Sequence, residues 1–232
     1  MSFLFLKDWA GDWRAYVAEF LGTFVFVFIV CGTTLANLFY VDIGILGVAL
    51  ASGLVYTAML LATINSSGGY LNPAVTLALW LVQKIKGHLA FFYIFAQLLA
   101  SFAAAGLLLL IFGSSAKEFS LGGPVLAAGI SQQTAVVVEA ILSAIIVFTV
   151  FATIVDKKNS TGFGPLAIGL VVAGGSIFAA SITGAAFNPA RALGPLVISG
   201  SYESIVVWII GPLAGSLFGI VYEFLFLRKV KK

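Results

Sequence analysis

The sequence predicts an all-α membrane protein in which six transmembrane helices and two half-length helices form an inverted repeat. Three observations lead to this prediction. The chain has 232 residues, of which 61% are apolar and only 9% are charged, whereas a soluble domain carries about 25% charged residues. Six apolar stretches are long enough to cross a bilayer. Two shorter apolar stretches each begin with an Asn-Pro-Ala triplet.

The composition also narrows the classes of function. The mean hydropathy of +1.13 favours lipid as the solvent. The net charge of +3 lies at the chain ends and in short loops, without a basic stripe, so we expect no nucleic-acid partner. Cys31 is the only cysteine, which excludes an intramolecular disulfide and a cysteine metal site. Because the sequence offers no nucleophile–base pair and no metal cluster, we expect no enzymatic activity.

The expected spans follow from length. A helix needs roughly 20 mostly apolar residues to cross about 30 Å of hydrocarbon. Six stretches meet this requirement, near Tyr16 to Phe39, Gly44 to Ile64, Leu89 to Phe112, Thr134 to Val155, Phe163 to Ile182 and Ile205 to Leu227. Two further stretches, Asn72 to Val82 and Asn188 to Ile198, have about 11 residues each, which is roughly 16 Å at 1.5 Å per residue. We therefore expect these two to be half-helices that enter the membrane without crossing it.

Landmarks of the first half of the chain recur in the second half. Glu19 in VAEFLGTFVFVF corresponds to Glu139 in VVEAILSAIIVF, at an offset of 120 residues. Asn72 in GGYLNPAVTLAL corresponds to Asn188 in GAAFNPARALGP, at an offset of 116 residues. Each half holds three spans, an odd number, so the second half enters the membrane from the opposite face. This pattern indicates an inverted repeat with a pseudo-two-fold axis in the membrane plane.

The basic residues predict the orientation. We expect one domain over residues 1–232, with repeats over about 14–112 and 134–228, joined outside the cell by a loop over 113–133. Ten of the twelve basic residues fall on one side of this topology: Lys7, Arg14, Lys84, Lys86, Lys157, Lys158, Arg228, Lys229, Lys231 and Lys232. The positive-inside rule then places both termini in the cytoplasm.

The two triplets predict where the half-helices begin. They are Asn72-Pro73-Ala74 and Asn188-Pro189-Ala190. Asparagine is a favoured N-cap and proline a favoured first helical residue. The inverted symmetry brings the two N-termini together at mid-membrane, each with about half a positive charge. A capping asparagine uses its side-chain carbonyl on the helix, so we expect its amide N–H groups to be free to donate to one passing oxygen. A water held in this way cannot relay a proton, and the helix ends oppose cations.

Three charged residues within the apolar stretches complete the predicted site. The loops over 66–71 and 183–187 are irregular, and such backbone at membrane depth must be buried in protein or line a wet cavity. We expect the carbonyls just before each asparagine to be pore acceptors. Arg191 offers fixed donors and a charge that repels cations, since an intramembrane arginine is functional by default. Glu19 and Glu139 are expected to accept backbone N–H groups of the irregular loops.

These residues resemble those of the aquaporin and glycerol-facilitator (major intrinsic protein) family. The resemblance rests on AEFLGTF, SGGYLNPAVT, FNPAR and GPLAG, and it covers essentially the whole chain. It implies an aquaporin-like bundle that assembles as a homotetramer in a cell membrane, with one pore per subunit. It also implies passive transport of water and small neutral solutes without a cofactor.

In that family a second constriction, on the extracellular side, sets solute choice. The resemblance places this selectivity filter at Ser52 and Ser176 of the second and fifth spans, Ala185 of the second loop, and Arg191. Strict water channels carry an aromatic residue and a histidine at the first two positions. Glycerol facilitators carry aromatics too, and usually an aspartate directly after the arginine, where this chain has Ala192.

The small filter residues predict a wider and more polar constriction than in a strict water channel. We therefore expect passage of water together with small polyols or other neutral hydroxylated solutes. Tyr56, one turn below Ser52, or Phe187 would narrow the path if its side chain turned inward.

A secondary transporter is the alternative function, because inverted repeats and broken helices also occur in that class. It would have to couple ions through Glu19, Glu139 and Arg191, each of which already has a role in pore architecture. An ion channel is disfavoured, since the sequence contains neither a ring of carboxylates nor a carbonyl filter motif.

Overall fold

The protein folds as a bundle of long helices around two short ones. The computed structural model describes residues 11–156, 158 and 162–227, and within them six helices are long and apolar enough to cross a membrane. The first five spans are α2 (Trp13–Phe39), α3 (Gly44–Ser67), α5 (Gly87–Phe112), α6 (Gln132–Val150) with its π-helical end η2 (Phe151–Val155), and α7 (Gly164–Thr183). The sixth span consists of α9 (Val207–Ser216), α10 (Phe218–Tyr222) and the π-helical turn η4 (Glu223–Leu227).

The short helices are α4 (Pro73–Leu81) and α8 (Pro189–Ser199). The prediction of six spans and two half-helices is therefore confirmed, and every predicted end lies within three residues of the observed one. No strand occurs among the residues that the structure describes.

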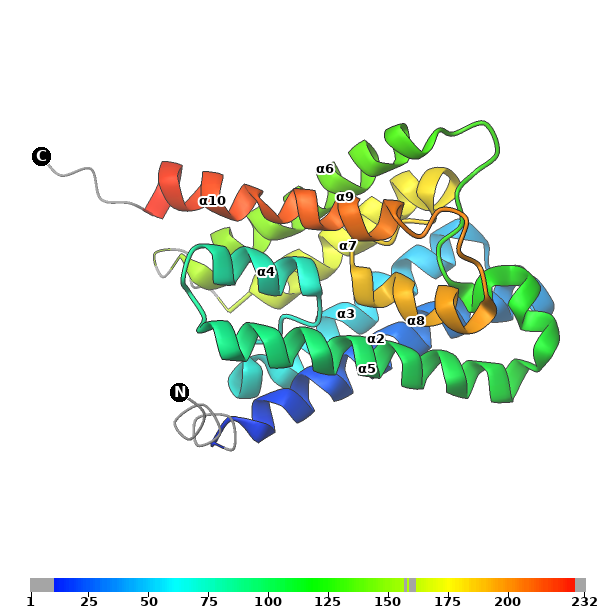
Figure 1. Cartoon of the computed structure of the whole chain (residues 1–232), viewed down its shortest axis with the longest axis horizontal. Coiled ribbons are helices and arrows are strands. Elements are labelled where there is room, and N and C mark those ends of the chain that lie inside the picture. The colour runs from blue at the N-terminus through cyan, green and yellow to red at the C-terminus, as the bar shows by residue number, and fades with distance from the viewer. Residues whose placement is uncertain (1–10, 157, 159–161, 228–232) are drawn as a thin grey trace, which may run out of the picture.

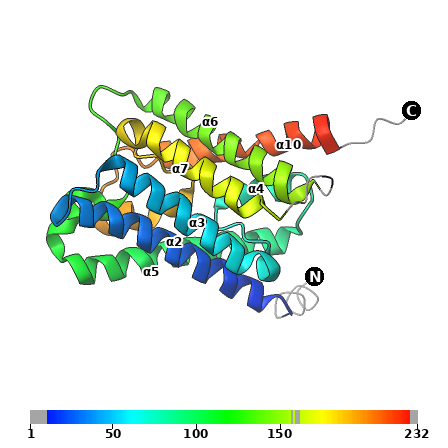
Figure 2. The ribbon, with the colours of Figure 1, turned by 180° about the vertical axis from the view of Figure 1, so that it is seen from behind.

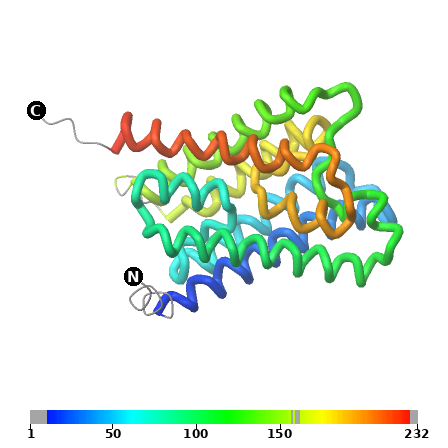
Figure 3. Tube along the Cα trace, viewed as in Figure 1, coloured from blue at the N-terminus to red at the C-terminus, as the bar shows by residue number. Residues whose placement is uncertain are grey.

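The half-helices occupy the middle of the bundle. In Figures 1 and 3, α4 and α8 lie between α9 on one side and α5 on the other, one toward each end of the molecule. Each half-helix contacts the last span of its own half and also the last span of the other half. Seen from behind, α6, α7, α3 and α2 lie side by side in that order (Figure 2), and the contacts between neighbours in this row agree.

Side-chain size separates the inner and outer faces of the spans. On α5, Ala96, Ala100 and Ala104 are buried at four-residue spacing, while Phe91 and Phe95 are exposed on the outside. Small residues on the inner face let helix backbones approach closely, and large apolar side chains on the outer face suit lipid. The chain is accordingly a multi-pass membrane protein.

Glycines allow close approach between neighbouring spans. A Cβ on Gly53 of α3 would overlap the carbonyl oxygen of Gly169 on α7, and a Cβ on Gly169 would overlap Oγ1 of Thr57. On α9, a Cβ on Gly211 would lie 2.6 Å from Cβ of Glu139. Because these glycines have no side chain, α3 can lie directly against α7, and α9 directly against α6.

The described ends of the chain lie at the same end of the bundle (Figure 1). The start of α2 and the end of η4 are at one end of the bundle, and the segment that joins α5 to α6 is at the other (Figure 1). Of the basic residues that predict the orientation, Lys7, Lys157 and those in 228–232 lie outside the described residues. The cytoplasmic placement of the termini stays a prediction.

The connection between the halves differs from the expected loop. It contains a 3-10 helix, η1 (Ser114–Gly122), whose last three residues are left-handed: Ser120 at φ 53°, Leu121 at φ 50° and Gly122 at φ 72°. This turn buries Leu121 completely and brings Gly122 against the backbone of Cys31 on α2. Residues 120–124 therefore pack into the bundle, whereas most of the segment on either side of them is exposed.

Candidate functional site

Both triplets begin a half-helix. Asn72 is extended at φ −153°, and its Oδ1 accepts a hydrogen bond from the backbone N–H of Ala74 at 2.9 Å. Asn188 is extended at φ −152°, and its Oδ1 accepts from Ala190 N at 2.9 Å and from Arg191 N at 3.4 Å. Asn72 thus caps one, and Asn188 two, of the N–H groups that a helix start leaves unpaired.

The asparagine amides are not entirely free, which corrects one expectation from the sequence. Nδ2 of Asn72 donates to the carbonyl oxygen of Phe187 at 3.1 Å, and Nδ2 of Asn188 donates to the carbonyl oxygen of Leu71 at 2.9 Å. A side-chain amide has two hydrogens, so each asparagine keeps one for another acceptor. The last carbonyl of each loop accepts from the opposite half: that of Phe187 also accepts from Ser143 Oγ at 3.2 Å, whereas that of Leu71 has one lone pair left for another donor.

Glu19 is the centre of the first loop. Its side chain is fully buried, and its Oε1 accepts from Ser67 Oγ at 2.6 Å and from Tyr70 N at 2.9 Å. Its Oε2 accepts from Leu71 N at 2.7 Å and from Gln97 Nε2 at 2.7 Å. Four donors around one carboxylate compensate the cost of burying it and hold the loop in one conformation.

Glu139 holds the second loop in a matching way. Its Oε1 accepts from Thr183 Oγ1 at 2.6 Å and from Ala186 N at 3.0 Å, and its Oε2 accepts from Phe187 N. Each donor of this loop lies 116 residues after its counterpart in the first loop.

The helices that precede the loops end alike. Gly68 at φ 94° ends α3, and Gly184 at φ 75° ends α7. Both are left-handed, the usual conformation of a glycine that stops a helix. The same local geometry therefore leads into both half-helices.

Two polar residues of α5 belong to the site but were not singled out in the sequence analysis. Nε2 of Gln97 also donates to Oγ1 of Thr76 at 3.0 Å, so it joins the Glu19 carboxylate to α4. Oγ of Ser101 donates to the carbonyl of Ala190 and accepts from Gly194 N at 2.9 Å, so it holds α8. Their signal in the sequence is two polar residues one turn apart on the inner face of an apolar span.

Arg191 lies in the first turn of α8 and is 5% exposed. Its Nη1 is buried and has no hydrogen-bond partner among the residues that the structure describes. A buried charged donor without an acceptor is costly, by about 1–3 kcal/mol or more. This nitrogen is therefore suited to an acceptor that is not part of the protein.

The other three residues assigned to the filter come from different elements. Ser52 lies on α3 and Ser176 on α7, two helices that pack side by side. Oγ of Ser52 donates to the carbonyl of Val48 in its own helix at 2.8 Å, which leaves the hydroxyl oxygen to accept. Ala185 is in the second loop at φ 50°, and its N–H donates to Oγ1 of Thr183.

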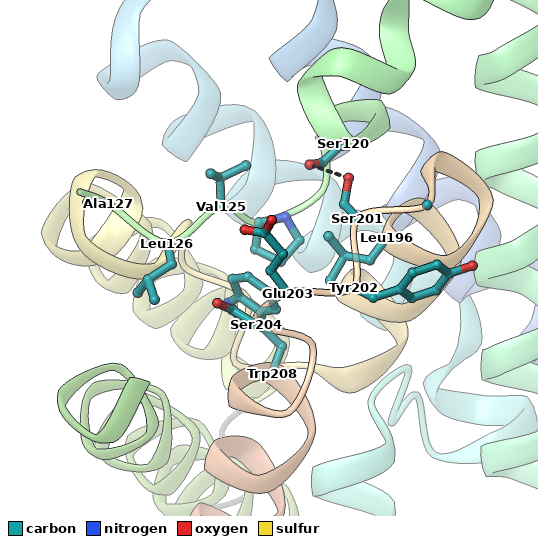
Figure 4. Close-up of a pocket in the computed structure, with 12 residues that line it drawn as sticks. Ser120, Val125, Leu126, Ala127, Leu196, Ser201, Tyr202, Glu203, Ser204 and Trp208 are labelled. Atoms are coloured by element: carbon teal, nitrogen blue, oxygen red, sulfur yellow. Dashed lines mark hydrogen bonds between the residues drawn. The ribbon is translucent and has the colours of Figure 1, made fainter. Parts of the chain in front are cut away.

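A cavity of about 470 Å³ lies beside the second half-helix (Figure 4). Ser120, Ser201, Glu203 and Trp208 are among the residues that line it, and the four filter residues are not. Nε1 of Trp208 donates to the carbonyl of Thr183 at 2.9 Å, so the wall of this cavity supports the second loop. No cluster of three potential metal ligands occurs in the described part of the chain.

Comparison with known proteins gives consistent matches over most of the chain. Residues 6–222 match the model of a family described as major intrinsic protein. The chain is 39% identical over 229 residues to the probable aquaporin TIP4-1 of Oryza sativa subsp. japonica, covering 95% of this chain and 90% of that one. It is 37% identical over 226 residues to aquaporin-4 of Rattus norvegicus, covering 94% and 69%. The X-ray structure of the aquaglyceroporin from Plasmodium falciparum matches with a TM-score of 0.79 and 27% identity, covering 91% and 96%.

Proposed function

The chain belongs to the major intrinsic protein family, and from this premise we propose that it passes water together with small neutral hydroxylated solutes while excluding protons and ions. Aquaporins of this family are passive channels rather than enzymes, so a channel for water and small solutes is the established part of this function. The choice of solute and the exclusion of ions are the proposed part.

The proposal rests on the two asparagines, each of which caps a half-helix and donates a hydrogen bond to the loop of the other half. Asn72 and Asn188 each keep one amide hydrogen, and each caps a helix whose N-terminus carries about half a positive charge. Two donors directed at one water oxygen orient its hydrogens away from the centre, which interrupts a proton relay. The paired positive helix ends raise the energy of a cation at the same point.

The proposed choice of solute rests on the small filter residues. Ser52, Ser176 and Ala185 leave more room than an aromatic residue and a histidine would. Nη1 of Arg191 lacks a protein acceptor, and the hydroxyl oxygen of a water or a polyol would supply one. A wide filter with a fixed donor favours neutral molecules that carry hydroxyl groups.

Assembly and location are part of the same proposal. We expect a homotetramer in a cell membrane, with both termini in the cytoplasm. The start of α2 and the end of η4 lie at one end of the bundle, as this topology requires (Figure 1). Native mass spectrometry of the detergent-solubilised protein tests the tetramer, and labelling of terminal tags in intact and permeabilised cells tests the orientation.

Stopped-flow measurements on proteoliposomes test the function. We expect faster shrinkage than in empty liposomes under an osmotic gradient, and uptake of glycerol, urea or boric acid above the lipid background. Proton flux, followed with an internal pH dye, should equal that of empty liposomes. Permeation of water alone would overturn the wide filter, and solute counterflow or voltage dependence would favour a transporter.

A further inference from the structure

Tyr56 lies one helical turn after Ser52 on α3. Residues four apart on a helix share a face, so the Tyr56 side chain follows the filter serine along the same inner face, about 6 Å further along the helix. The side chain is 2% exposed, and it is among the largest fully buried side chains of the protein. A small polar residue and a bulky aromatic one therefore follow each other along one face.

The phenol of Tyr56 reaches the loop that leads to the first asparagine. Its hydroxyl donates to the carbonyl oxygen of Tyr70, two residues before Asn72, at 3.0 Å. Tyr56 thus extends from the filter helix to the level of the asparagine pair.

The ring of Tyr56 is held from a second side. Phe26 of α2 packs against it edge to face, with ring centroids 4.7 Å apart and an interplanar angle of 71°. An edge-to-face contact of this kind contributes about 0.5–1.5 kcal/mol beyond the buried area. The contact with Phe26 and the hydrogen bond to the Tyr70 carbonyl together hold the Tyr56 ring in one orientation.

The same hydrogen bond changes what the loop can offer a solute. The carbonyl of Tyr70 is one of the acceptors expected just before Asn72, and the Tyr56 hydroxyl occupies one of its lone pairs. The carbonyl of Leu71 accepts from Asn188. Two of the acceptors expected in this loop are therefore already bonded within the protein, one of them to the phenol.

We propose that Tyr56, rather than the small-residue filter, sets the upper size limit of the solutes that this channel passes. The inference rests on the proposed function, because it concerns the same conduction path. The wide outer filter admits hydroxylated solutes, and the fixed phenol one turn deeper separates the compact ones from the larger ones.

Substitutions at Tyr56 and a matched control at Tyr93 test this. The hydroxyl of Tyr93, on α5, also donates to a carbonyl of the first loop, that of Ser67 at 3.0 Å. Tyr93→Phe therefore removes a comparable hydrogen bond to the first loop, donated by a tyrosine on α5 instead of α3. Tyr56→Phe, Tyr56→Ala, Tyr56→Trp and Tyr93→Phe are reconstituted, and the permeability to glycerol is divided by that to water.

We expect this ratio to rise several-fold in Tyr56→Ala, to rise less in Tyr56→Phe, and to fall in Tyr56→Trp while water still passes. Tyr93→Phe should keep the ratio of the unaltered protein. If Tyr56→Ala does not fold, the opposite shifts of Tyr56→Phe and Tyr56→Trp carry the test.

An unchanged ratio in all folded Tyr56 variants that conduct water would overturn the size limit and leave the proposed function intact. Absence of water conduction in the unaltered protein would instead overturn the proposed function. The two failures are thus distinguishable.

Discussion

The side-chain amide of Asn72 lies 3.1 Å from the carbonyl oxygen of Phe187, 115 residues further along the chain. The cap of one half-helix is therefore bonded to the loop that leads into the other. The reciprocal bond from Asn188 to Leu71 closes the pair at 2.9 Å. The two helix starts are held together by donors that belong to the caps themselves.

Asn188→Asp should weaken both stability and water transport. A carboxylate can still accept from Ala190 N, but it cannot donate to the Leu71 carbonyl and it repels that oxygen. We expect a loss of about 1–3 kcal/mol of stability, the usual cost of an unpaired buried polar group, seen as a lower unfolding temperature in detergent, and slower water flux in stopped flow.

Asn37→Asp is the matched control for this change. In the structure the Asn37 side chain takes part only as an acceptor: its Oδ1 accepts from the N–H groups of Ile43 and Gly44. A carboxylate can accept the same two hydrogen bonds. Equal behaviour of the two variants would contradict the role of the Asn188 donor.

Glu139→Ala should destabilise the second loop strongly, because three donors lose a buried acceptor at once. Glu139→Gln should be milder, since its amide oxygen still accepts part of the set, although its amide N–H groups then face other donors. The unfolding temperature should fall in the order parent, Gln variant, Ala variant. Glu118→Gln, at an exposed position of η1, should leave it unchanged. An Ala variant as stable as the parent would refute the supporting role of this carboxylate.

Gly169→Ala and Gly174→Ala separate close packing from helix propensity within α7. The added methyl at Gly169 would overlap Thr57, whereas at Gly174 it meets nothing within 4 Å. We expect Gly169→Ala to cost about 1–3 kcal/mol, as overpacking does, and Gly174→Ala to be neutral or to stabilise by up to about 1 kcal/mol. Thermal unfolding of the two purified variants gives the comparison, and similar unfolding temperatures would argue against the tight contact between α3 and α7.

Mercury should not block the protein through the filter. Ala185 offers no thiol, and Cys31, the only cysteine, is fully buried. Ala185→Cys should make water flux sensitive to mercuric chloride, with recovery after addition of a thiol, and it should do so in the Cys31→Ser background as well. Strong block of the Cys31→Ser protein without the new cysteine would contradict the position assigned to Ala185.

The parts of the fold that could be predicted from the sequence are those determined by neighbouring residues. Span ends follow apolar length, and the half-helices follow the local capping chemistry of Asn72 and Asn188. The left-handed turn at Ser120 and Leu121 could not be predicted, because neither residue favours positive φ. Burial of Leu121 in the finished bundle stabilises a conformation that the local sequence disfavours.

The site could be predicted only in part for a related reason. A glutamate within an apolar span indicates that hydrogen-bond donors must surround its carboxylate. The sequence does not show which residues provide these donors. Gln97 reaches Glu19 from 78 residues away, and the partner of the Asn72 amide comes from the other half of the chain. Contacts of this kind depend on how the spans pack, which apolar length does not specify.

The donors around Glu19 have a consequence for biosynthesis. All of them lie between Ser67 and Gln97, so the first loop can take its final shape before the second half has been made. The acceptor for Asn72 is synthesised 115 residues later, which at about 5–20 residues per second is a delay of roughly 6–23 seconds. During that interval the Asn72 cap of the nascent first half can form, but its amide has no acceptor from the second half. The conduction path can therefore form only after Phe187 has been synthesised.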